Sequence, residues 1–139
     1  MENIVEEVFK NTRMGIYSLD KMLDVTHNQK LAMELQDQKK RLEEINKEAF
    51  SMLDYDAVKR NDINLFEKGM ISGGIAVKTL SDNTDNKIAS MLIEGNNMGL
   101  NSLQKYINAL KDENKEVPRI ADRLMGEYVH SIDTLRCYL

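Results

Sequence analysis

The chain has 139 residues, 42% of them hydrophobic and 30% charged, and this length predicts one domain, residues 1–139, with a single core. No apolar run approaches the ~20 residues that cross a bilayer, so a membrane-spanning protein is excluded. The net charge of −4, without a clustered basic surface, argues against nucleic acid as a partner.

Apolar residues recur at helical spacing along the whole chain, and no segment alternates as a half-buried strand does. A first helix is predicted from about residue 3 to 24. Thr26 followed by Gln29 is a capping-box pattern for a second helix, which we expect to continue to about Met52. The stripe of that helix repeats about every seven residues, as in antiparallel bundles. The stretch "DYDAVKRND" is predicted to be a polar link.

The segment from about residue 63 to 80 is apolar on two sides. Its two sides are Phe66, Met70, Gly73 and Val77 on one, and Leu65, Gly69, Ser72 and Ala76 on the other. Such a helix either lies in the centre of the core or forms part of an interface between copies. We therefore predict a possible interface made by Leu65, Phe66, Met70 and Ala76.

Two further helices complete the predicted fold. "SDNTDN" offers several capping residues, and a long helix is expected from about residue 85 to 110. Pro118 suits the first turn of a last helix that reaches the end of the sequence. The predicted fold class is all-α, an antiparallel four-helix bundle with an extra or broken helical segment at about 63–80.

A nine-residue pattern occurs twice, as "RMGIYSLDK" in the first helix and "NMGLNSLQK" in the long one. In both copies the glycine falls on the inward stripe, and glycine in mid-helix costs ~1 kcal/mol relative to Ala. Small residues at a spacing of four also let helices approach closely. We predict close helix packing at Gly15, Gly69, Gly73, Gly95 and Gly99. The alternative is that some of these glycines admit a ligand.

The paired hairpins, together with "MLIEGNNMGLNSL" and "GEYVHSIDTLRCYL", resemble the ferritin-like superfamily, in particular short uncharacterised bacterial members. The resemblance implies a four-helix bundle. In active members it also implies two metal ions, iron or manganese, held in the core by Glu and Glu-x-x-His ligands. If this chain bound metal, the resemblance would assign Glu94, Glu127 and His130 as ligands.

Helical phase argues against that metal site. At ~100° per residue, His130 lies about 160° from the centre of its apolar stripe, and Glu127 lies near the flank. Glu94 also falls outside the inward arc of its helix. We therefore interpret Glu127 and His130 as an exposed pair and expect no cofactor. The inward polar residues are neutral groups that suit a polar core or a ligand pocket and are poor metal ligands: Thr12, Gln38, Asn96 and Ser102.

The sequence therefore favours a non-catalytic helical module that binds itself, as a homo-oligomer, or another protein. Two alternatives stay open: a ferritin-like oxidase or storage protein with an incomplete metal site, and a small-molecule carrier with a pocket between helices. A single cysteine and an acidic N-terminal segment without an apolar stretch favour a cytoplasmic protein. No membrane partner is expected.

Overall fold

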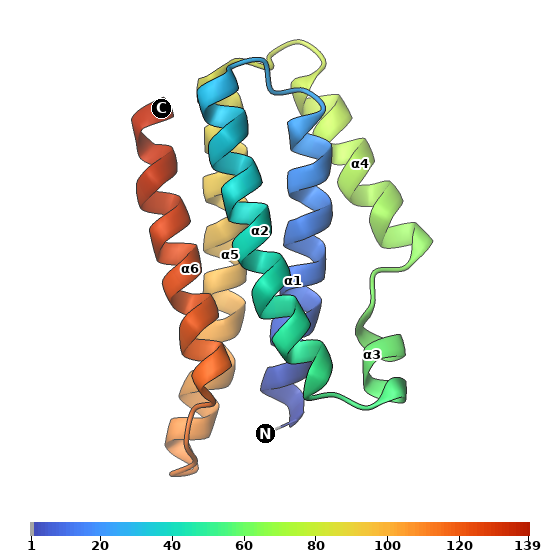
Figure 1. Ribbon diagram of the computed structural model, residues 1–139, viewed down its shortest axis with the longest axis vertical. Helices are drawn as coiled ribbons and strands as arrows, with labels where there is room; N and C mark the ends of the chain where they lie inside the picture. The colour runs from blue at the N-terminus through green and yellow to red at the C-terminus, as the bar shows by residue number, and fades with distance from the viewer. Residues whose placement is uncertain (1) are drawn as a thin grey trace.

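The computed structural model describes the backbone of residues 2–139 and the side chains from residue 4 onward (Figure 1). This part of the chain is all-helical, without a strand, so the predicted all-α class is confirmed. Its elements are α1 (Glu2–Leu23), α2 (Gln29–Ser51), α3 (Tyr55–Asn61), α4 (Leu65–Thr79), α5 (Asp85–Asp112), α6 (Arg119–Leu135) and the short 3₁₀ helix η1 (Arg136–Tyr138). No helix of the described residues is long and apolar enough to cross a membrane.

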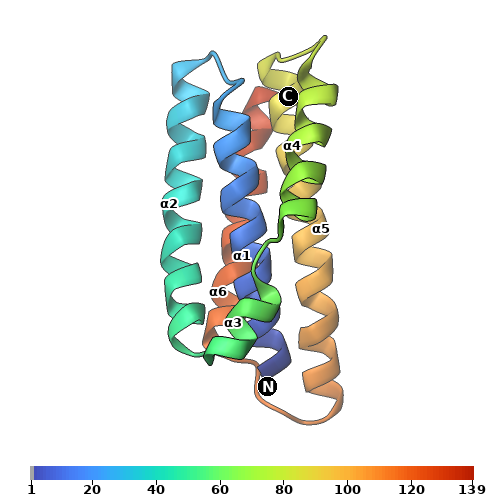
Figure 2. The same ribbon diagram turned by 90° about the vertical axis from the view of Figure 1, so that its right-hand side faces the viewer.

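Four long helices, α1, α2, α5 and α6, lie side by side along the long axis of the molecule (Figures 1 and 2). Helices α1 and α6 run in one direction, and α2 and α5 run in the other. The pairs α1–α2, α5–α6, α2–α6 and α1–α5 are in contact. Because α2 ends at the opposite end of the molecule from the start of α5, the chain returns along the outside through α3 and α4.

Local signals explain where the helices begin. Asn28, and not Thr26, caps α2: its side-chain oxygen accepts hydrogen bonds from the backbone N–H groups of Lys30 at 2.8 Å and Leu31 at 3.2 Å. The predicted capping box is therefore wrong, because the Thr26 hydroxyl instead donates to the carbonyl of Met22 at 2.7 Å. The amide group of Asn28 also donates to Asp85 at 2.7 Å and so ties the starts of α2 and α5 together.

The predicted polar link contains a short helix, α3. Asp54 caps it by accepting from the N–H of Ala57 at 2.8 Å, and Ala57 is fully buried. Three polar contacts fix this segment to α1. Asn61 donates to Glu6 at 2.9 Å, Arg60 forms an ion pair with the same carboxylate, and Arg13 pairs with Asp62 at 3.0 Å.

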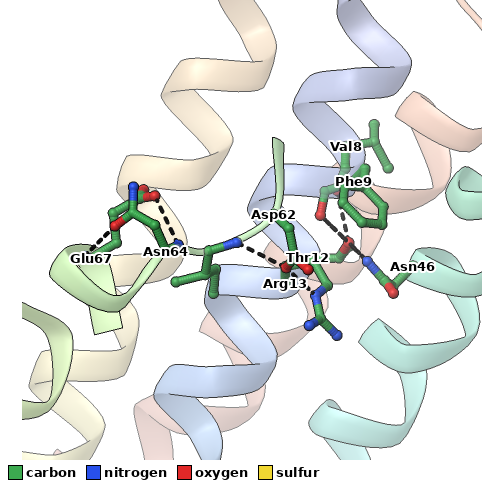
Figure 3. A network of polar contacts seen from close by, with 9 residues as sticks. Val8, Phe9, Thr12, Arg13, Asn46, Asp62, Asn64 and Glu67 are labelled. Carbon is green, nitrogen blue, oxygen red and sulfur yellow. Dashed lines mark hydrogen bonds and ion pairs between the residues drawn. The ribbon is translucent and has the colours of Figure 1, made fainter. Parts of the chain in front are cut away.

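The core lies between the four long helices and holds one polar network (Figure 3). The Thr12 hydroxyl is fully buried, 2.8 Å from the carbonyl of Val8 and 2.9 Å from that of Phe9. It accepts a hydrogen bond from the Asn46 amide at 2.9 Å. Burying a polar group costs little free energy only when the group is hydrogen-bonded, so these hydrogen bonds allow α1 and α2 to pack tightly around the Thr12 hydroxyl.

Helix α4 lies against α1 on the outside of the molecule (Figure 2). It begins with a capping box in which Asn64 accepts from the N–H of Glu67 at 2.8 Å. Its inner face carries the buried residues Ile75 and Thr79. Helix α4 therefore corresponds to the extra segment expected at about 63–80, and it covers α1 from outside the four long helices, with Ile75 joining the core.

Candidate functional site

The three residues that the family resemblance would assign to metal differ in their exposure to solvent. Glu94 and His130 are exposed, in agreement with their predicted helical phase. Glu127 is a correction to the sequence analysis, because its side chain is only 10% exposed. In the part of the chain that the structure describes, no three His, Cys, Asp or Glu side chains are grouped so that they could hold a metal ion.

The Glu127 carboxylate is occupied by protein partners. Arg41 of α2 donates to its two oxygens from Nε at 2.8 and 3.0 Å, and Ser131 donates to it at 3.1 Å. Glu34 lies 3.9 Å from the Arg41 Nη2 atom, close enough for an ion pair but not for a hydrogen bond. Glu127 therefore joins the two helical hairpins as an ion pair across α2 and α6. The residues present do not fit a di-metal centre, since the carboxylate is engaged and the imidazole of His130 faces outward.

A second polar cluster surrounds Glu7, a residue that the sequence analysis missed. Ser102 of α5 donates to the Glu7 carboxylate at 2.6 Å. The negative charge of Glu7 raises the pKa of the Tyr106 hydroxyl, and burial and a hydrogen bond to Glu7 raise it further. Burial, and then the charge of Glu7, raise the pKa of Tyr128. Both phenols therefore keep their protons to a higher pH than a free tyrosine does.

Two of the four predicted inward polar residues have hydrogen-bond partners, and the other two each have a side-chain nitrogen without one among the described residues. Thr12 and Ser102 have the partners described above. Gln38 is 2% exposed, and neither its side-chain nitrogen nor that of Asn96 has a hydrogen-bond partner in the described chain. These residues do not line the pocket that the structure shows, which is an open depression on the outer surface of α6 beside Gly126 and Val129. The structure thus gives no specific support to a carrier pocket at the four predicted residues.

The predicted close-packing glycines divide into two groups. A Cβ atom at Gly99 would lie 2.6 Å from the hydroxyl oxygen of Tyr128, and one at Gly15 would lie 2.9 Å from Cδ1 of Leu42. Both glycines therefore sit at close contacts between helices. At Gly69, Gly73 and Gly95 no atom of a neighbouring element lies within 4 Å of such a Cβ, so the close contact expected within the chain is absent there.

The outer face of α4 is an apolar surface that is exposed to solvent. We define it as Phe66, Gly69, Met70, Gly73, Ala76, Val77 and Leu80, which fall within a sector of about 120° on the helix. All seven are exposed, and none is charged. The exposed fractions of the four large side chains are 75% for Phe66, 63% for Met70, 75% for Val77 and 88% for Leu80. Leu65, at the edge of this face, is 87% exposed.

The opposite side of α4 explains why this face points outward. The Tyr17 hydroxyl of α1 forms a hydrogen bond with the Ser72 hydroxyl at 2.7 Å. The ammonium group of Lys68 lies 5.8 Å from the centre of the Tyr17 ring, within the range of a cation–π contact. Together with Ile75 and Thr79, these contacts fix the rotation of α4 and leave its apolar outer face without a partner inside the chain.

Comparison of the chain with protein-family models, with curated proteins and with solved structures gives no match in any of the three. The function is therefore inferred from the geometry of the molecule.

Proposed function

We propose that this chain is a non-catalytic helical module that binds a protein partner through the outer face of α4. The observation that carries the proposal is the combination of full exposure and absence of charge along one whole side of a helix of 15 residues. Single exposed apolar residues are ordinary on proteins, whereas a contiguous exposed apolar surface marks an interaction site.

The magnitude of the apolar surface suits reversible binding. Burying a Val, Leu, Met or Phe side chain stabilises by roughly 1.5–3 kcal/mol. Five such side chains, from Leu65 to Leu80, would together contribute roughly 8–15 kcal/mol before costs. Association itself costs about 4–15 kcal/mol in lost freedom of motion, so the surplus favours a partner that binds and dissociates.

For the rest of the molecule we propose the role of a scaffold with the layout of an antiparallel four-helix bundle. The directions of α1, α2, α5 and α6, and the single long return through α3 and α4, support this reading. One long crossover connection is typical of ferritin-like bundles. In this proposal the crossover between the two helical hairpins carries the binding face.

The proposal of a non-catalytic function is supported by what the polar groups do. Glu127, the one part-buried carboxylate of the Glu-x-x-His pattern, is paired with Arg41. The carboxylate of Glu7 accepts from Ser102 and lies among phenols whose pKa values are raised. The two carboxylates each link a pair of helices, α2 with α6 through Arg41 and α1 with α5 through Ser102.

Photo-cross-linking tests the proposed surface. A photoreactive amino acid at Met70, which is 63% exposed, is compared with the same amino acid at Met33 of α2, which is 64% exposed. We expect a discrete cross-linked product at position 70 that is absent at position 33. Equal labelling at the two positions would refute the docking surface.

A further inference from the structure

We propose that the partner of α4 is the α4 helix of a second copy of this chain, packed antiparallel across a two-fold axis beside Gly73. The proposal rests on the proposed function, in which the outer face of α4 is a docking surface, and it adds the identity and the orientation of the partner. A two-fold contact between identical chains requires one surface that is complementary to itself.

The shape of the outer face is self-complementary in the antiparallel orientation. With the axis beside Gly73, each residue of one helix lies at the level of the residue equally far on the other side of Gly73 in the second copy. At ~100° per residue, Met70 and Val77 lie on one flank of the face, and Gly69 and Ala76 lie on the other. The two-fold axis of an antiparallel pair brings like flanks together, so Met70 of one copy packs beside Val77 of the other, and the small residues Gly69 and Ala76 lie together on the opposite flank. The pair thus buries the large apolar side chains on one flank and permits close approach of the backbones on the other.

The ends of the face are complementary as well. Phe66 of one copy lies opposite Leu80 of the other, and both are at least 75% exposed in the single chain. The glycines leave the backbone open at the centre, where nothing of the chain lies within 4 Å of a Cβ at Gly69, Gly73 or Gly74. Small residues at a spacing of four permit close approach of two helices. In the pair, the second copy would fill the space beside these glycines that is open in the single chain.

Charge selects the antiparallel orientation. Glu67 and Lys78 lie on one flank of α4, near its opposite ends, and neither forms an ion pair within the described chain. In an antiparallel pair, Glu67 of one copy lies one residue, ~1.5 Å along the helix, from the level of Lys78 of the other. A parallel two-fold pair would place this flank of the two copies on opposite sides of the contact, so Glu67 and Lys78 would have no partner of opposite charge there.

Disulfide cross-linking in a Cys137→Ser background tests the pair. Cys137 is exposed and is the only cysteine of the sequence, so replacing it by Ser leaves the introduced cysteine as the only thiol. Gly73→Cys lies beside the proposed axis, where the two Cα atoms can approach within the ~4.4–6.8 Å that a disulfide needs. Gly126→Cys is the matched control, because it is also an exposed helical glycine with open space around it.

Phe66→Cys and Leu80→Cys report the orientation. Two copies of Phe66 in the antiparallel pair are about 21 Å apart along the helix, too far for a disulfide. We therefore expect no dimer from either variant alone and a mixed disulfide when the two proteins are combined, one carrying a tag to mark it by size. Gly73→Cys should cross-link at least tenfold faster than Gly126→Cys.

Three results would overturn the proposal. Disulfides of Phe66→Cys with itself and Leu80→Cys with itself would show a parallel pair. Cross-linking at Gly73→Cys without the mixed product would exclude this orientation. No cross-linking above the Gly126→Cys control would exclude a second copy as the occupant. In that last case the docking surface itself is judged separately, by photo-cross-linking at position 70 against position 33.

Discussion

Glycines inside helices have opposite surroundings in two regions of this molecule. In α1 and α5, Gly15 and Gly99 lie where a side chain of the adjacent helix would come within 3 Å of an added Cβ. In α4, Gly69, Gly73 and Gly74 have nothing of the chain within 4 Å of one. Glycine therefore serves close packing at Gly15 and Gly99, whereas every glycine of α4 faces open space, as Gly95 and Gly126 also do.

The difference shows what must be explained in α4. Glycine in a helix interior costs about 1 kcal/mol relative to Ala. Between the long helices this cost is offset by the close approach that Gly15 and Gly99 permit. In α4 no contact within the chain offsets it, and the same face exposes Phe66 and Met70 to water. A contact outside the chain would account for both features, and this is the basis of the proposed pairing.

The largest expected effect comes from filling a packed glycine. Gly99→Leu should lower the free energy of unfolding by about 3 kcal/mol, because the new side chain would overlap the buried Tyr128 ring and the core cannot make room. Urea denaturation measures the change. If the contact is the cause, the loss should shrink in a Tyr128→Leu background; an unchanged loss would show that Tyr128 is not what excludes a side chain there.

The next effect concerns the ion pair between the two hairpins. Glu127→Ala should cost about 1–2 kcal/mol, less than for a fully buried pair because the Arg41 side chain is 34% exposed. His130→Ala, three residues away and exposed, should change stability by less than about 0.5 kcal/mol. The reverse order of the two variants in a denaturation experiment would contradict the helical phase of α6.

An alkaline titration tests the Glu7 cluster. The pKa of Tyr128 is raised from its ordinary 10.0 in the folded protein, so the unfolded state loses its proton first as pH rises. The stabilisation is therefore complete below pH ~10 and is lost above it. Between pH 10 and 11 the wild-type protein should lose about 1 kcal/mol more than Tyr128→Phe, which cannot ionise. Identical pH profiles for the two proteins would show that Tyr128 is accessible to water.

The smallest effect is a gain in stability at an open glycine. Gly74→Ala should raise the free energy of unfolding by about 0.5–1 kcal/mol, because Ala favours the helix and meets no neighbour. Thermal unfolding at low protein concentration measures it. A loss of stability would mean that Gly74 is covered, and would remove the contrast between α4 and the long helices.

The spacing of apolar residues predicted much of the fold because each long helix buries one stripe of apolar side chains. The outward position of His130 followed from the same stripe. Helix α3 was missed, since a helix of 7 residues with one buried side chain, Ala57, leaves no periodic signal. The capping residue of α2 was misassigned because Thr26 and Asn28 are both good caps, and only the path of the chain chooses between them.

The contacts of the candidate site were harder to predict from the sequence than the helices were. Glu127 lies at the flank of its stripe, and its partner Arg41 is 86 residues away, so helical phase alone could not show the burial. Glu7 was overlooked for the same reason: its partner Ser102 is 95 residues distant. For α4 the apolar pattern on two sides was recognised. Whether that helix is central or peripheral depends on tertiary packing, which the pattern does not contain.

The central claim, that the outer face of α4 holds a second copy, is tested most directly by molar mass from light scattering. At about 100 μM, more than half of the chains are paired in any dimer with a lower Kd, so the average mass of the wild-type chain and of Met33→Lys should lie well above that of one chain and approach twice it. Met70→Lys should have the mass of one chain. A wild-type protein that remains a single chain at this concentration, or a Met70→Lys protein that stays dimeric, would contradict the account.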